Sequence, residues 1–117
     1  MNLYLDGSML ILLASSKDKK KELCHRIEEA LSNGDEILTS VLSVEECIDY
    51  FFQQGVDPYP FLESIRELVS AVLSLDDSEI TLALTQKKMR NIEFRQILHE
   101  TIARENHCRY LQRGNLS

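Results

Sequence analysis

The stretch LYLDGSMLILL, residues 3–13, decides the fold that we predict for this chain. Residues 3–5 form a short, apolar, β-prone run, which predicts a buried strand. The turn-forming residues 6–8 follow directly, and the apolar run at 9–13 then predicts a short helix. A buried strand that passes through a tight polar turn into a helix is typical of α/β proteins, in which ligands bind beside the carboxyl ends of the strands.

The rest of the chain continues this alternation of strands and helices. Short apolar runs between turn-forming residues predict further strands, and apolar residues at helical spacing predict amphipathic helices. Strands joined by helical crossovers pair in parallel, so the sequence predicts a parallel sheet of about four strands, the third of them buried, with helices on both faces. We expect these strands at residues 36–39, 71–75 and 108–111, and helices at 19–31, 43–52, 61–69, 79–90 and 94–102.

The length and composition fit one ordinary folded domain. The chain has 117 residues, of which 44% are hydrophobic and 27% charged, so we treat residues 1–117 as a single domain with a packed core. The net charge of -6 argues against a protein that wraps duplex nucleic acid in positive charge. An excess of carboxylates fits either a solvated surface or a site for a hard cation such as Mg2+ or Mn2+.

The cysteines and the short apolar runs predict a soluble, cytoplasmic protein. Cys24, Cys47 and Cys108 are odd in number and contain no C-x-x-C motif, which indicates reduced thiols. The apolar run at 9–13 is much shorter than the roughly 20 apolar residues that span a bilayer. We therefore expect no membrane segment.

Three carboxylates stand after predicted strands, where a ligand would bind. Asp6 directly follows the first strand, and Glu45 and Glu46 follow the second. Each also has a purely structural explanation, because Asp6 precedes a glycine in a turn and a glutamate near a helix start favours the helix dipole. Ser43, with Glu46 three residues on, resembles a capping box for the helix that follows. The helical spacing does not decide between Glu45 and Glu46 as a ligand.

Four segments, in this order along the chain, resemble the successive signatures of PIN domains. They are DGS at 6–8, TSVLSVEE at 39–46, Asp76 with Ala83, and IEFRQILH at 92–99. The resemblance covers nearly the whole chain and rests on the order and spacing of short motifs. PIN domains are three-layer α/β/α sandwiches with a central parallel sheet, and many are Mg2+- or Mn2+-dependent ribonucleases, including the VapC-like toxins of toxin-antitoxin pairs.

The resemblance implies roles for individual residues. Asp6 would be the first metal-binding and catalytic acid, with Ser8 as its polar neighbour. Glu46 would be the second, because the family places that acid three residues after a Ser or Thr. Gln96 stands where the family has its third acid, and Asn115 stands at the position of a fourth. The resemblance also implies single-stranded RNA as the substrate, a homodimer, and an antitoxin protein as a partner.

Two departures from the family pattern support a second hypothesis. Gln96 brings an amide oxygen but no charge, and Arg113 replaces the Thr that usually precedes the position of Asn115. We therefore expect a weaker metal site than a full set of acids would make. The alternative is a catalytically silent PIN-like domain that binds RNA or assembles with protein. A third class, a small signalling or scaffold domain of receiver-like fold, would require an early pair of acids and a late Lys that are not evident here.

Neighbouring residues on the last predicted helix, and the aromatic residues, have simpler explanations. Glu93 and Glu100 share a helical stripe with Gln96, and a solvated acidic face accounts for them. We predict that His99 is an ordinary surface histidine without a catalytic role. Aromatic side chains cluster around residues 50–61, where they either pack in the core or form an oligomer interface or partner groove.

Overall fold

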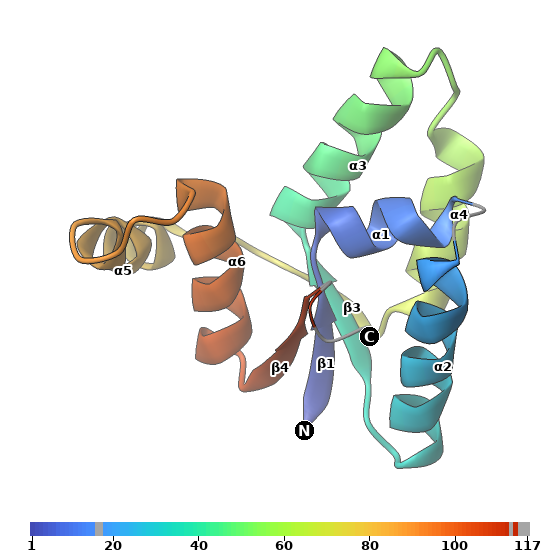
Figure 1. Cartoon of the computed structure of the whole chain (residues 1–117), viewed down its shortest axis with the longest axis horizontal. Coiled ribbons are helices and arrows are strands. Elements are labelled where there is room, and N and C mark those ends of the chain that lie inside the picture. Colours follow the sequence, from blue (N-terminus) through green and yellow to red (C-terminus); the bar gives the residue numbers. More distant parts are fainter. Residues whose placement is uncertain (16–17, 113, 115–117) are drawn as a thin grey trace.

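A four-stranded parallel sheet forms the centre of the molecule (Figure 1). The structure is a computed structural model and describes residues 1–15, 18–112 and 114. The strand order is β3-β2-β1-β4, so the first strand of the chain lies inside the sheet and the other strands add on both sides of it. The strands are β1 (Asn2–Leu5), β2 (Ile37–Ser40), β3 (Ala71–Leu73) and β4 (Cys108–Leu111).

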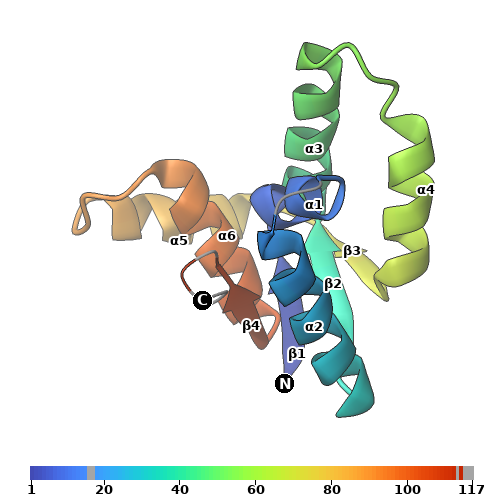
Figure 2. The ribbon, with the colours of Figure 1, turned by 45° about the vertical axis from the view of Figure 1, so that its right-hand side comes forward.

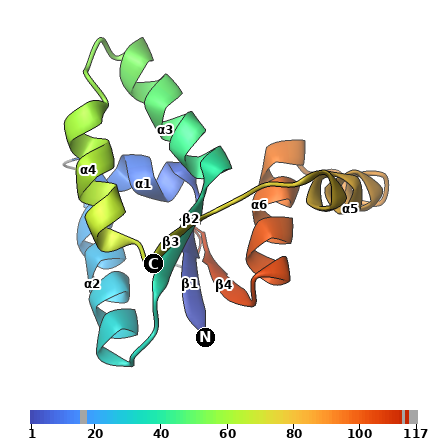
Figure 3. The same ribbon diagram turned by 180° about the vertical axis from the view of Figure 1, so that it is seen from behind.

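Helices cover both faces of the sheet, which confirms the predicted three-layer α/β/α sandwich. Helices α1 to α4 share an apolar core on one face, and Figure 2 shows the chain turning back from α3 into α4 as a helical hairpin. On the other face α6 packs beside β4, and α5 packs against α6 (Figures 1 and 3). None of the described helices is both long and apolar enough to cross a membrane. The helices are α1 (Gly7–Leu13), α2 (Lys19–Ser32), α3 (Val41–Gln53), α4 (Tyr59–Leu68), α5 (Asp77–Lys87) and α6 (Phe94–Glu105).

Alternate side chains of β1 point to opposite layers, as the period of two in a strand requires. Leu3 and Leu5 are fully buried in the core shared with α1 and α2. Tyr4 is equally buried, but it packs on the opposite face with Ile102 of α6. The strand therefore presents one hydroxyl to the α6 layer, and that hydroxyl must find a hydrogen-bond partner there.

Two local details differ from the sequence predictions. The third strand is predicted to be buried, but the first two residues of β3 are exposed because this strand lies at the edge of the sheet. Ser43 is predicted to cap α3, but the cap is Ser40, whose side chain accepts a hydrogen bond from the Ser43 backbone N–H. The helix begins earlier than expected because β2 runs into it without an intervening loop.

The aromatic residues around 50–61 divide between the core and the surface. Phe51 is buried, and its ring packs edge-on against Phe61 at a centroid distance of 5.3 Å. Phe52 and Tyr59 are 67% and 60% exposed. The cluster therefore builds part of the core and also leaves large rings on the outer surfaces of α3 and α4.

Gly7 allows α3 to approach the start of α1. A Cβ added at Gly7 would lie 2.7 Å from the Cβ of Glu46 and even closer to Glu46 Oε1, which is nearer than real Cβ atoms come to other atoms. The bare backbone of Gly7 therefore forms a wall against which the Glu46 side chain packs. Because Asp6 is the N-cap of α1, this contact holds Glu46 next to the first candidate acid.

We predict that Gly7→Ala lowers the free energy of unfolding by about 1–3 kcal/mol, because the added methyl group forces α1 and α3 apart. Gly114→Ala is the matched control, since a Cβ at Gly114 meets no atom of the described residues within 4 Å. Chemical denaturation of both variants measures the effect. A Gly7→Ala protein as stable as the wild type would contradict the close approach of the two helices.

Candidate active site

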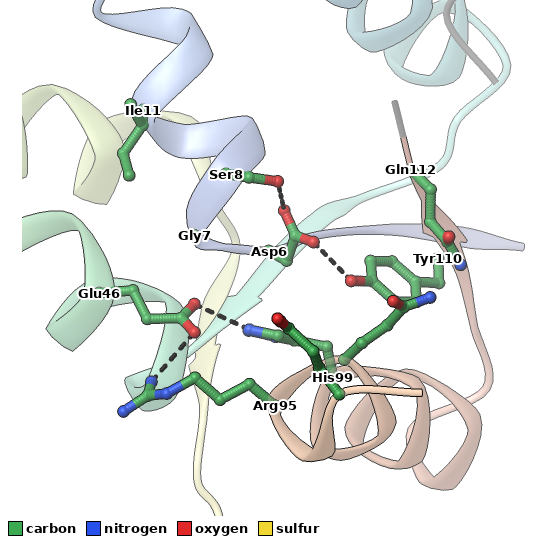
Figure 4. Close-up of a pocket in the computed structure, with 11 residues that line it drawn as sticks. Asp6, Gly7, Ser8, Ile11, Glu46, Arg95, His99, Tyr110 and Gln112 are labelled. Atoms are coloured by element: carbon green, nitrogen blue, oxygen red, sulfur yellow. Dashed lines mark hydrogen bonds and ion pairs between the residues drawn. The ribbon is translucent and has the colours of Figure 1, made fainter. Parts of the chain in front are cut away.

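An open pocket of about 470 Å3 gathers the candidate acids at the carboxyl end of β1. Asp6 follows β1 directly, and Glu46 reaches the same space from α3 (Figure 4). Ser8 and Gln96 also line the pocket. Four of the residues singled out in the sequence, from three separate segments, therefore meet at one place in the fold.

Asp6 is held by three neutral hydrogen-bond donors. Its Oδ1 accepts from the backbone N–H of Met9 at 3.0 Å, and this bond caps α1. The same oxygen accepts from Ser8 Oγ at 2.7 Å. Its Oδ2 accepts from the hydroxyl of Tyr110 on β4 at 2.5 Å (Figure 4). Burial and the negative charge of Asp6 raise the pKa of Tyr110, so the phenol stays protonated and donates. Asp6 thus caps a helix and at the same time exposes its carboxylate to the pocket.

Glu46 is held by two basic side chains instead. Its Oε1 lies 2.8 Å from His99 Nε2, and its Oε2 accepts from Arg95 Nη1 at 3.0 Å (Figure 4). Burial raises the pKa of Glu46, but the hydrogen bonds and charges of His99 and Arg95 outweigh it and hold the pKa below 4.5. The carboxylate is therefore ionised near neutral pH, and each of its oxygens already has a donor.

His99 is buried, which corrects the prediction of a surface histidine. Its side chain is only 5% exposed, and its Nδ1 lies 2.7 Å from the hydroxyl of Tyr4. Because an ionised carboxylate only accepts, Nε2 must donate to Glu46, while Nδ1 on the other side of the ring is hydrogen-bonded to the Tyr4 hydroxyl. The Tyr4 oxygen lies 2.7 Å from Ser40 Oγ and 3.2 Å from Ser43 Oγ. A continuous hydrogen-bonded chain thus runs from the end of β2 through β1 and α6 to Glu46.

The sequence contains one signal for this series of hydrogen bonds that apolar periodicity does not reveal. Tyr4 is a polar aromatic residue in the middle of a strand predicted to be buried, so its hydroxyl needs an internal partner. The helical spacing left Glu45 and Glu46 undecided, and the structure shows that the buried residues of α3 are Ser43, Cys47 and Phe51. With this face buried, Glu46 lines the pocket and Glu45 does not.

The other candidates separate into those inside the pocket and those outside it. Glu93 lines the pocket together with Gln96. Glu100 does not line it, because this carboxylate pairs with Arg90 at 2.5 Å. Glu45 is 62% exposed and lies 3.5 Å from Arg95, at the outer edge of the site. Arg113 and Asn115 lie outside the described residues.

The oxygen donors in the pocket are of the type that a divalent cation prefers. They do not form a complete ligand set, so a bound cation would be held weakly. Among the described residues, no group of three or more His, Cys, Asp or Glu side chains is placed to hold a metal ion. The pocket is lined by the carboxylates of Asp6, Glu46 and Glu93 and by the amide of Gln96, all of which carry the oxygen donors that Mg2+ and Mn2+ prefer. Such a set fits a cation that completes its shell with water and substrate oxygens.

Comparison with known proteins adds no assignment, because neither the protein-family models nor the curated proteins contain a match to this chain.

We predict that the stability that Glu46 contributes is present at neutral pH and is lost in acid. Because folding lowers the pKa of Glu46 from 4.5, the folded state favours the ionised form, and its contribution disappears as the pH falls through the folded pKa. Unfolding of the wild type and of Glu46→Gln, measured from about pH 7 to pH 3, should give a stability difference that shrinks below about pH 4.5.

Glu63→Gln makes the same chemical change on the exposed surface of α4 and separates this effect from the loss of one surface charge. A stability difference between the wild type and Glu46→Gln that does not change with pH would contradict the ionised, donor-held state of Glu46.

Proposed function

We propose that this chain is a PIN-like, metal-dependent endoribonuclease that hydrolyses phosphodiester bonds of single-stranded RNA in the pocket formed by Asp6 and Glu46. The observation that carries the proposal is the meeting of these two carboxylates beside Gln96 in one open pocket at the end of a parallel sheet. Parallel sheets bind ligands at this edge, and paired carboxylates in such a place are suited to a hard cation.

In this proposal Asp6 and Glu46 hold Mg2+ or Mn2+, and the amide oxygen of Gln96 is a neutral third donor. The cation, when bound, lowers the pKa of an attacking water and offsets the negative charge of the phosphodiester. The protein orients both carboxylates. Ser8 and Tyr110 fix the two oxygens of Asp6, and His99 fixes Oε1 of Glu46.

Protein partners belong to the same proposal. The exposed rings of Phe52 and Tyr59 on the α3–α4 hairpin are large apolar surfaces of the kind that interfaces bury. A homodimer and an antitoxin protein are the partners we propose for a toxin of this class. The three cysteines are unpaired, which suits a reducing cytoplasm.

A catalytically silent PIN-like domain that binds RNA or protein is the second candidate. Its support is specific, because Glu46 is already neutralised by Arg95 and because Gln96 brings no charge where a third acid would stand. Two carboxylates hold a divalent cation less firmly than three or four do.

We predict that the protein cleaves labelled single-stranded RNA with Mg2+ or Mn2+ and that EDTA abolishes the cleavage. Asp6→Asn should lower the rate by at least about 100-fold, since one of two charged ligands is lost, while Asn still caps α1. Glu63→Gln, with its exposed carboxylate on α4, is the control that should cleave like the wild type.

Two results would contradict this proposal. Folded wild-type protein that cleaves no RNA with either cation would contradict the nuclease and favour the silent domain. Cleavage that Asp6→Asn leaves unchanged would indicate a contaminating nuclease and contradict the assignment of the pocket.

A further inference from the structure

We propose that the guanidinium of Arg95 and a divalent cation compete for Glu46, so that the cation binds only when Arg95 leaves the carboxylate. This inference rests on the proposed function in one respect, which is the use of the pocket by a cation. It assigns to Arg95, the second residue of α6, the role of a built-in competitor that weakens cation binding in the resting protein.

The competition follows from the way the two oxygens of Glu46 are occupied. Arg95 Nη1 donates to Oε2 at 3.0 Å, and His99 donates to Oε1 at 2.8 Å. A cation shared between Asp6 and Glu46 would take a lone pair on one oxygen of each carboxylate, and the donors that already hold the Asp6 oxygens are neutral. It would also have to approach a guanidinium that already carries a positive charge, which like-charge repulsion opposes.

Only the Arg95 side of Glu46 is able to open. The His99 side chain is 5% exposed and is fixed from behind by Tyr4, so moving it would leave buried polar groups without partners. The Arg95 side chain is 55% exposed, and water can solvate its guanidinium once it leaves. The structure thus fixes one oxygen of Glu46 and leaves the other exchangeable.

Glu45 provides a second position for the displaced guanidinium. Arg95 Nη1 already lies 3.5 Å from Glu45 Oε2, and the Glu45 side chain is 62% exposed. A small rotation of Arg95 toward Glu45 would keep one ion pair while it releases Oε2 of Glu46. The neighbouring glutamates therefore have different roles: Glu46 belongs to the pocket, and Glu45 lowers the cost of opening it.

Mn2+ binding to the purified, full-length chain tests the competition without any catalytic readout. We use the loss of the free Mn2+ signal in electron paramagnetic resonance for affinity, and the shift of the melting temperature as a second measure. Removing Arg95 with Arg95→Gln should tighten Mn2+ binding by about 3- to 10-fold, the range expected for one partly exposed ion pair and its charge.

Two variants make the result specific. Arg104→Gln removes the same charge from an exposed position near the other end of α6, and it should leave the affinity near that of the wild type. Asp6→Asn combined with Arg95→Gln should abolish the tight binding if the cation occupies the pocket.

The outcomes separate the two proposals. Equal Mn2+ affinity of the wild type and Arg95→Gln, with loss of binding in Asp6→Asn, would overturn the competition and leave the cation site standing. Weaker binding by Arg95→Gln would also overturn it, since Arg95 would then support the site. Absence of Mn2+ binding in the wild type and in Arg95→Gln would overturn the cation site itself, and the competition with it.

Discussion

The hydrogen bond between Glu46 and His99 is the interaction on which the site depends. It joins α3 to α6, which belong to opposite layers, and it continues through Tyr4 into the central strand β1. This hydrogen-bonded series of side chains is buried except at Glu46. Among the described residues, every buried side-chain polar atom has a hydrogen-bond partner. A buried polar chain of this kind is stabilising only when it is complete, so its members hold one another in place.

Asp6 and Glu46, the two carboxylates of the proposed cation site, are held by different kinds of donor. Asp6 accepts from a hydroxyl, a backbone N–H and a phenol, none of which carries a charge. Glu46 accepts from Arg95, which balances it with a positive charge. The negative charge of Asp6 is therefore not paired with a positive charge among these donors, whereas the negative charge of Glu46 is paired with Arg95. In the proposed competition, a divalent cation would change that balance by displacing Arg95 from Glu46.

The sequence predicts the local features of this fold because they depend on neighbouring residues. The strand and the short helix within residues 3–13 are both present, because apolar periodicity acts within a few positions. The expected turn at residues 6–8 is reduced to Asp6, because the helix already begins at Gly7. The position of Asp6 at the strand end follows from the same pattern. Errors arise where tertiary context decides, as at Ser43, which lies inside α3 because β2 passes directly into the helix.

The partners of the site residues were not predictable in the same way. Glu46 and His99 are 53 positions apart, and Tyr4 and His99 are 95 apart, so no periodic pattern connects them. A histidine and an arginine on a helix that also carries acidic residues suggest a solvated face when they are considered alone. Their role appears only when α6 packs on β1 and faces the start of α3.

The most direct test is a crystal structure of the protein in Mn2+, with the metal located by its anomalous scattering. A cation pocket with Arg95 as competitor predicts one Mn2+ peak between the carboxylates of Asp6 and Glu46, with Arg95 turned toward Glu45 and His99 still on Oε1. A pocket without such a peak, in which Arg95 keeps its hydrogen bond to Glu46 at saturating Mn2+, would contradict both the cation site and the competition.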